Sequence, residues 1–166
     1  YHGVDARFRP MKTGLEAERA KYQFSERPYL FSIGTVQPRK NYGRLVEALA
    51  ILRERGYDLD LVIAGGRGWL ENPLYDTICN TKLSDHVHLI GYADDEDLPV
   101  LISHASCVAY PSLYEGFGLP VLEGMACGTP VVTASTSSLP EVAGDAALMV
   151  DPYDVEAITH ALQRVL

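Results

Sequence analysis

Short runs of hydrophobic residues alternate with amphipathic stretches along the chain from residue 29 onward. Each run is continuously apolar and rich in β-branched residues, which is typical of strands buried on both faces of a parallel sheet. The runs occupy residues 29–34, 59–66, 86–91, 106–112, 130–135 and 146–152. The stretches with helical features occupy residues 41–56, 72–83, 94–105, 120–128 and 154–166. This alternation predicts an α/β domain with a Rossmann-like, doubly wound parallel sheet.

The helix predicted over residues 41–56 has the clearest pattern. Its apolar residues recur at helical spacing, at Leu45, Ala48, Leu49 and Leu52. Asn41 is expected to cap the amino end of this helix, and Gly56 is expected to end it. The helix over residues 94–105 is expected to carry acidic residues in its first turn.

Residues 1–28 have mixed charges and no strong periodicity. They are predicted to form an interdomain connection, with one short amphipathic stretch, ahead of a domain at residues 29–166. The chain starts without a methionine and ends within a helical pattern, so we expect an excised domain of a larger protein.

The composition mainly excludes classes of partner and of location. A net charge of −8, without any block of Lys and Arg, argues against a nucleic-acid partner, although a local pocket can still attract a small anion. Cys79, Cys107 and Cys127 share no C-x-x-C spacing and are expected to be free, mostly buried thiols in a reducing compartment. No apolar run approaches the length of a membrane span and no signal-peptide pattern opens the chain, so a cytoplasmic location is expected.

Ligands of such a sheet bind in the loops at the carboxyl ends of its strands. One of these loops, "EGFGLP", follows a predicted strand and opens a helix. Gly116 and Gly118 would let backbone N–H groups approach a ligand closely, and Pro120 suits the first helical turn. Amides at a helix amino end attract phosphate, so this loop is a candidate anion site. A tight turn would explain the same glycines equally well.

Two glutamates flank this loop eight positions apart, Glu115 before the turn and Glu123 near the first turn of the helix. A carboxylate can accept hydrogen bonds from two neighbouring hydroxyls, such as those of a ribose. Acids beside an anion site are consistent with a ligand that carries both hydroxyls and phosphates, which indicates a nucleotide sugar. The alternative for Glu123 is a carboxylate that complements the helix dipole.

Arg39 and Lys40 lie in the loop after the first strand, beside a helix start. They could clamp phosphate, or they could be an ordinary solvated pair. The glycine-rich stretch at 64–69 lacks the G-x-G-x-x-G pattern, and Trp69 is expected to pack rather than to stack on a ligand. His86 and His88 alternate in a strand, but no cysteine or carboxylate in the sequence pattern completes a metal set with them, so no metal site is predicted.

These features together resemble the C-terminal domain of retaining GT-B glycosyltransferases, in particular glycosyltransferase family 4. The resemblance covers nearly the whole chain and rests on several stretches: "HGVDARFRP", "SIGTVQPRKN", "LVIAGG", "HLIGYADDED", "YPSLYEGFGLPVLEGMACGTPVV" and "SSLPEVAGDAALMVDPYD". Its most specific element is the E-x7-E spacing from Glu115 to Glu123, followed by "GMACGTPVV".

The resemblance implies a donor site for a nucleotide-diphosphate sugar. Glu115 would approach the sugar, Glu123 would hold the ribose, and Lys40 with Arg39 would neutralise the diphosphate, with Glu115 and Lys40 acting as the catalytic residues. The amides that would receive the diphosphate are those around Gly116, Phe117, Gly118 and Leu119. Tyr92 and Ala93 would border the base.

The resemblance also implies what lies outside this chain: an N-terminal acceptor domain, a C-terminal tail and any part that contacts a membrane. The expected whole enzyme transfers a hexose with retention, without cofactor or essential metal, to a glycan or lipid-linked acceptor in polysaccharide biosynthesis, whereas this fragment alone is expected to be inactive. Thr35 stands where many members carry arginine, and "GT…PRKN" is similar to a mannosyltransferase-like subgroup, which favours GDP-mannose as the donor. The alternatives are a GT-B epimerase or phosphorylase, and a non-catalytic nucleotide-binding module.

Overall fold

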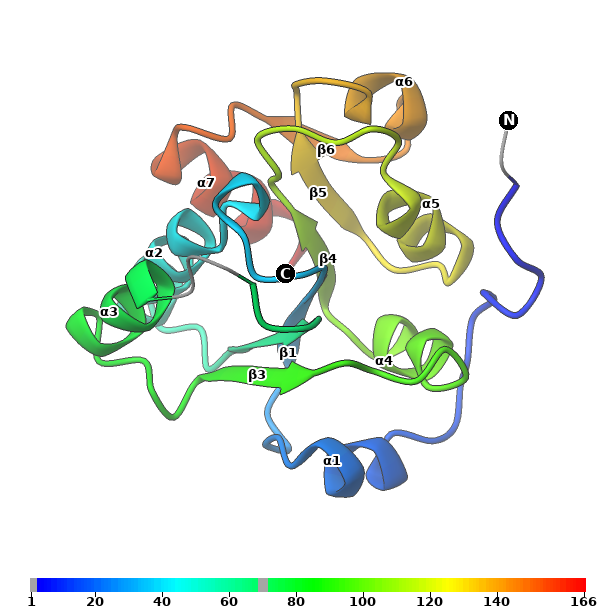
Figure 1. The fold of residues 1–166 in the computed structure, drawn as a ribbon, viewed down its shortest axis with the longest axis horizontal. Helices are drawn as coiled ribbons and strands as arrows, with labels where there is room; N and C mark the ends of the chain where they lie inside the picture. The colour runs from blue at the N-terminus through cyan, green and yellow to red at the C-terminus, as the bar shows by residue number, and fades with distance from the viewer. Residues whose placement is uncertain (1–2, 69–71) are drawn as a thin grey trace.

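The structure, a computed structural model, describes residues 3–68 and 72–166. Over these residues the strands form one six-stranded sheet in the order β3-β2-β1-β4-β5-β6, and every neighbouring pair is parallel (Figure 1). The strands are β1 (Tyr29–Ile33), β2 (Asp60–Ala64), β3 (Val87–Gly91), β4 (Cys107–Tyr110), β5 (Val131–Ala134) and β6 (Leu148–Val150). The predicted Rossmann-like, doubly wound α/β fold is therefore confirmed.

Helices connect the strands and cover both faces of the sheet. They are α1 (Glu16–Tyr22), the 3-10 turn η1 (Pro38–Lys40), α2 (Tyr42–Glu54), α3 (Asn72–Asn80), α4 (Leu98–Ser103), α5 (Leu119–Ala126), α6 (Leu139–Ala143) and α7 (Val155–Val165). The short helix α6 was not predicted, because five residues are too few to show a helical period. The placement of acids in the first turn of α4 was wrong, because this helix begins only at Leu98 and the acidic residues form the loop before it.

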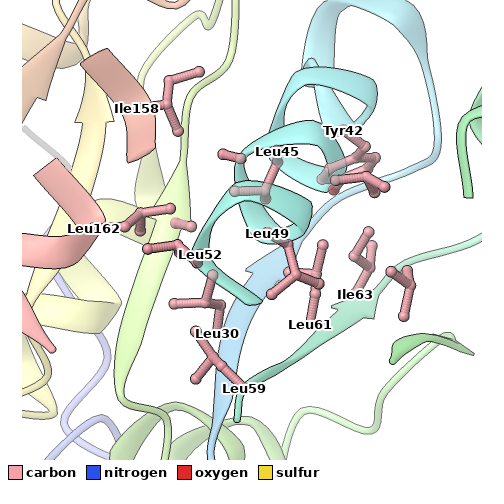
Figure 2. Close-up of a cluster of buried hydrophobic side chains, with 14 of the residues drawn as sticks. Leu30, Tyr42, Leu45, Leu49, Leu52, Leu59, Leu61, Ile63, Ile158 and Leu162 are labelled. Atoms are coloured by element: carbon pink, nitrogen blue, oxygen red, sulfur yellow. The ribbon is translucent and has the colours of Figure 1, made fainter. Parts of the chain in front are cut away.

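Two separate cores lie on the two faces of the sheet, and alternate residues of a strand serve different cores. Leu30 packs with residues of α2, α3 and α7, whereas Tyr29 and Phe31 pack with residues of α4, α5 and α6. Figure 2 shows the first core, in which Leu45 and Leu49 of α2 point toward the strands. Within the described ranges, no helix is both long and apolar enough to cross a membrane.

Asn41 precedes α2, as predicted, but the predicted capping contact is wrong. The backbone of Asn41 is left-handed, with φ of 63°, and its side chain makes no capping hydrogen bond. Instead, the buried amide donates to the carbonyl oxygens of Pro111, at 2.9 Å, and Pro152, at 2.7 Å. Asn41 thus holds together the loops that follow β1, β4 and β6, all at the carboxyl end of the sheet.

The opposite end of the sheet carries a polar cluster around Asp60, the first residue of β2, which is 1% exposed. Its carboxylate lies 2.9 Å from Nδ1 of His86 and 2.7 Å from Nε2 of His88, and it accepts a hydrogen bond from Ser25 at 2.5 Å. The pairing of β2 with β3 places Asp60 beside the two histidines, a contact that the sequence pattern did not show. In the described part of the chain, no group of three or more His, Cys, Asp or Glu is arranged to hold a metal ion.

The cysteines in the structure are free, and Cys107 and Cys127 are buried as predicted. Cys79 is exposed on α3, which is compatible with the prediction of mostly buried thiols. The interpretation of Trp69 as a packing residue falls outside the described residues.

We expect the Asp60→Asn variant to be less stable than the unchanged chain by roughly 1.5–3 kcal/mol at neutral pH, because it removes the charge that Ser25, His86 and His88 contact. Burial by itself raises the pKa of Asp60, but the hydrogen bonds from Ser25, His88 and His86 outweigh it and leave the pKa below its ordinary value. A lowered pKa stabilises the fold above the unfolded-state pKa of about 3.9, and this contribution disappears as the pH falls through the folded-state pKa.

Chemical denaturation across pH measures this difference. Asp58→Asn is the matched control, since the Asp58 carboxylate also pairs with Arg53 and Arg27 but its side chain is 72% exposed. If the two variants lose equal stability at neutral pH, the buried cluster does not stabilise the fold.

Candidate functional site

A pocket of about 390 Å³ opens at the carboxyl end of the sheet, where the strand order reverses between β1 and β4. Such switch points are where doubly wound sheets bind ligands. The pocket is lined by Ile33, Gly34, Lys40, Leu98, Tyr110, Glu115, Phe117, Gly118, Leu119, Pro120 and Glu123. Most of the side chains predicted for the site therefore lie around one cavity, although they come from segments up to 83 positions apart in the chain.

Lys40, at the end of η1, is only 6% exposed. Its Nζ donates to Oε1 of Glu115 at 2.6 Å and to the Tyr110 hydroxyl at 2.7 Å, and it lies 4.8 Å from the centroid of the Tyr110 ring. Burial lowers the pKa of Lys40, while Glu115 partly restores it. This is a buried cation rather than a solvated one, which removes the alternative of an ordinary surface pair for Lys40.

Gly34 makes room for this lysine. The backbone of Gly34 has φ of 142°, and a Cβ atom at this position would lie 2.6 Å from Cε and 2.9 Å from Nζ of Lys40. A side chain here would displace the ammonium group. Sequence reasoning treated Gly34 only as the end of a strand and missed both it and Tyr110 as parts of the site.

Glu115 is buried beside both predicted cations. Its Oε2 lies 2.9 Å from Nη1 of Arg39, in addition to the contact of Oε1 with Lys40. Burial by itself raises the pKa of Glu115, but the hydrogen bonds from Lys40 and Tyr110 outweigh it and lower the pKa, so the carboxylate is charged at neutral pH. The sequence predicted separate partners for the acid and the two cations, whereas in the structure both cations contact the acid.

Hydrogen bonds from outside the pocket fix the backbone around Glu115. The amide of Glu115 donates to the Ser137 hydroxyl at 3.0 Å. The Ser138 hydroxyl donates to the carbonyl oxygens of Glu115, at 2.9 Å, and Phe117, at 3.0 Å. The segment before α6, which the sequence analysis did not place in the site, therefore holds the glycine loop in position.

The glycine loop ends at Gly118, which precedes α5 in a left-handed conformation with φ of 101°. A Cβ atom on Gly118 would lie 2.6 Å from Cδ2 of Leu139, so this position requires glycine. By contrast, a Cβ atom on Gly116 would meet no protein atom within 4 Å. Pro120 lies in the first turn of α5, as predicted, and the amino end of α5 borders the pocket through Leu119 and Pro120.

Glu123 is the fifth residue of α5 and lines the pocket. Burial raises its pKa, Arg7 counteracts this effect and Asp95 adds to it. A helix dipole acts mainly on carboxylates within the first turn, so the position of Glu123 one turn further along weakens the dipole interpretation. Glu123 and Leu119 also line a neighbouring hollow of about 310 Å³ whose other wall is formed by the N-terminal segment.

The structure does not bring Tyr92 and Ala93 into the wall of the pocket. Tyr92 is 73% exposed and Ala93 packs into the core, with 5% exposure. Their loop adjoins the pocket through Leu98, the first residue of α4. The predicted contact of these two residues with a base therefore stays a prediction.

Comparison with known families gives one match over most of the chain. The family described as "Glycosyl transferases group 1" matches residues 15–166. The fold is that of GT-B glycosyltransferase structures.

Individual relatives are similar over most of this chain but are longer. The chain is 46% identical over 147 residues to O-antigen chain mannosyltransferase B of Escherichia coli, covering 87% of this chain and 39% of that protein. It is 34% identical over 174 residues to a GDP-mannose-dependent alpha-(1-6)-phosphatidylinositol monomannoside mannosyltransferase of Mycolicibacterium smegmatis. That match covers 99% of this chain and 45% of that protein. Among solved structures, Anabaena Alr3699/HepE in complex with UDP and glucose matches with a TM-score of 0.85 at 21% identity, covering 99% of this chain and 46% of that one. The chain thus spans less than half of the length of each.

Proposed function

Because the chain belongs to the group 1 glycosyl transferases, matching that family over residues 15–166, we propose that it is the donor-binding domain of a retaining enzyme of glycosyltransferase family 4. The observation that carries the proposal is the pocket in which a buried lysine, two carboxylates and the amino end of α5 come together. A ligand with a diphosphate between two hydroxyl-bearing parts matches this set of groups.

The diphosphate is proposed to lie at the amino end of α5. There the amides around Gly116, Phe117, Gly118 and Leu119 face it, together with the charges of Lys40 and Arg39. The open space beside Gly116 supports this placement, since nothing in the protein competes for it. An amino end of a helix with a nearby cation attracts an anion through both partial and full charges.

The two carboxylates are proposed to hold the two sugars of the donor. Glu123 accepts hydrogen bonds from the ribose hydroxyls, and Glu115 positions the transferred hexose. Tyr92 and Ala93, in the loop next to Leu98, border the base.

In the proposed reaction, the bond between the anomeric carbon and the phosphate oxygen breaks, and the oxygen of an acceptor hydroxyl forms the new bond to that carbon. The proton of the hydroxyl leaves with the diphosphate, on which negative charge builds up as the bond breaks. Lys40 and Arg39 stabilise that charge, with the amides of α5, which is electrostatic catalysis by groups already in place. The proposal needs no metal or cofactor, because the cationic role falls to these side chains. We assign no general base within this chain.

The proposed donor is GDP-mannose. Its support is that a 46% identical relative is named a mannosyltransferase and a 34% identical one a GDP-mannose-dependent mannosyltransferase. The acceptor, a glycan or a lipid-linked sugar of polysaccharide biosynthesis, is proposed to bind an N-terminal domain outside this chain. The proposed location is the cytoplasm, and the chain alone would then bind donor nucleotide without transferring sugar.

Nucleotide titrations of the chain and of its Glu123→Gln variant test this proposal. GDP is expected to bind the unchanged chain. Glu123→Gln is expected to lower the affinity for GDP about five- to thirtyfold, or roughly 1–2 kcal/mol, because the charge that strengthens the ribose hydrogen bonds is lost. The variant should bind 2′,3′-dideoxy-GDP as the unchanged chain does. Since the pKa of Glu123 is raised, the preference for ribose should decline on acidification at a higher pH than an ordinary glutamate would give.

Glu54→Gln, an exposed substitution on α2, is the control and should change neither affinity. If Glu123→Gln lowers the affinity for GDP and for 2′,3′-dideoxy-GDP equally, Glu123 does not contact the ribose. An unchanged chain that binds none of GDP, UDP or ADP would overturn the proposed donor site.

A further inference from the structure

The N-terminal segment, residues 3–28, contacts the acidic loop 92–97 that follows β3. Lys21 places its Nζ 2.6 Å from Oδ2 of Asp94 and 2.6 Å from Oδ2 of Asp97. Arg7, from the other end of the segment, lies 3.9 Å from Asp95. Three acids of one short loop are therefore paired with the N-terminal segment.

Tyr22 makes the most protected of these contacts. Its hydroxyl donates to Oδ2 of Asp97 at 2.5 Å and accepts a hydrogen bond from the backbone amide of Asp94 at 3.0 Å. One hydroxyl thus bridges both ends of the turn before α4. The Asp97 side chain is 18% exposed, whereas the Asp94 side chain is 61% exposed. Water therefore screens the contact of Tyr22 with Asp97 less than it screens the contact of Lys21 with Asp94.

The segment that presents Tyr22 is itself fixed to the domain. Arg19 donates from Nε to the carbonyl oxygen of Ser25 at 3.0 Å and from Nη2 to that of Glu26 at 3.1 Å, which closes the chain after α1. Phe24 is buried against Tyr29 of β1, with ring centroids 5.4 Å apart in an edge-to-face arrangement. Tyr22 therefore ties the loop to a rigid support rather than to a free end.

The loop 92–97 leads directly into the pocket wall. Leu98 follows it and lines the pocket together with Glu123. Asp95 is close enough to Glu123 to raise the pKa of that carboxyl. A shift of this loop would change the end of the pocket at Glu123, while the end at Lys40 and Glu115 is held by other contacts.

We propose that Tyr22 is a positioning residue for the nucleoside end of the donor site, because its hydroxyl bridges Asp94 and Asp97 and so sets the loop that leads into Leu98. The inference rests on the proposed function, in which this end of the pocket receives ribose and base. The N-terminal segment then takes part in recognising the nucleoside.

The Tyr22→Phe variant of this chain tests the inference, because it keeps the ring and removes the bridging hydroxyl. GDP and UDP are expected to bind about three- to tenfold more weakly, from the loss of a preorganised loop. Inorganic pyrophosphate, titrated as a probe of the phosphate end alone, is expected to bind within about twofold of the unchanged chain. Hydrogen exchange should accelerate at the amides of residues 92–98 and stay unchanged at residues 111–119. Tyr75→Phe, which removes an exposed tyrosine hydroxyl on α3, is the matched control and should alter none of these.

Two results would overturn the inference: unchanged exchange at residues 92–98 in Tyr22→Phe, or equal losses of nucleotide and pyrophosphate affinity, which would indicate a general disturbance of the domain. The proposed function fails separately, if the unchanged chain binds no nucleotide. In that case the exchange measurement alone decides whether Tyr22 sets the loop.

Discussion

A Lys40→Met variant is expected to bind GDP about ten- to a hundredfold more weakly than the unchanged chain, while its affinity for guanosine stays the same. Methionine keeps most of the apolar stem that passes Gly34 but removes the buried ammonium group. A charge-assisted contact to phosphate contributes roughly 1.5–3 kcal/mol, which corresponds to this loss. Isothermal titration with the nucleotide and with the nucleoside separates the phosphate contribution from that of the base and ribose.

Stability gives a second measurement on the same variant. Lys40→Met removes one of the cations that the structure shows beside the buried Glu115 and leaves Arg39, so the melting temperature is expected to fall. Adding Glu115→Gln to Lys40→Met should recover stability without recovering GDP affinity. Lys12→Met, at an exposed position, is the control for loss of a positive charge. If guanosine and GDP weaken equally, Lys40 does not contact the phosphates.

The second large effect is expected from Glu115→Gln in the full-length enzyme, where turnover should fall by at least about a hundredfold. The proposed contact of this carboxylate is the sugar whose anomeric carbon becomes cationic in the transition state, so removal of the charge acts on the reacting geometry. Binding of free GDP should respond in the opposite direction. Because Glu115 engages both Arg39 and Lys40, glutamine releases these cations, and GDP affinity is expected to rise about two- to fivefold.

The opposite signs of these two effects distinguish a catalytic contact from a structural one. A carboxylate that only holds the loop together would lower turnover and GDP affinity jointly when it is replaced. Glu141→Gln, exposed on α6, is the control and should change neither quantity. Full turnover in Glu115→Gln would remove this residue from the reaction, and a full-length protein without any transferase activity would favour the non-catalytic binding module.

The fold could be predicted well because its strands are apolar on both faces and its helices separate them at regular intervals. Leu30 and Phe31 face different cores, so the continuous run at residues 29–34 is the pattern that a doubly covered strand requires. The predictions failed where an element is too short to carry a period, as in α6, or where a polar residue serves a distant partner, as with Asn41.

The candidate site was predictable as a set of residues but not as a set of contacts. The loop after β1 and the glycine loop were expected at one edge of the sheet, because carboxyl ends of parallel strands meet there. The contact of Lys40 with Glu115 joins residues 75 positions apart, and no local pattern indicates it. Tyr110 reads as one more apolar strand residue, and only the structure shows its hydroxyl beside the Lys40 ammonium group.

The double hydrogen bond of Asn41 to Pro111 and Pro152 has a consequence for how the protein is made. During synthesis on the ribosome, the pocket-lining residues, the last of which is Glu123, leave the exit tunnel before residue 152 does. The loop that carries Lys40 therefore lacks one of its two Asn41 acceptors, and α2 lacks the packing of Ile158 and Leu162, until α7 has emerged. We expect nascent chains to become able to bind nucleotide only after α7 has left the tunnel, so that a ribosome stalled before α7 would present the sheet without a working pocket.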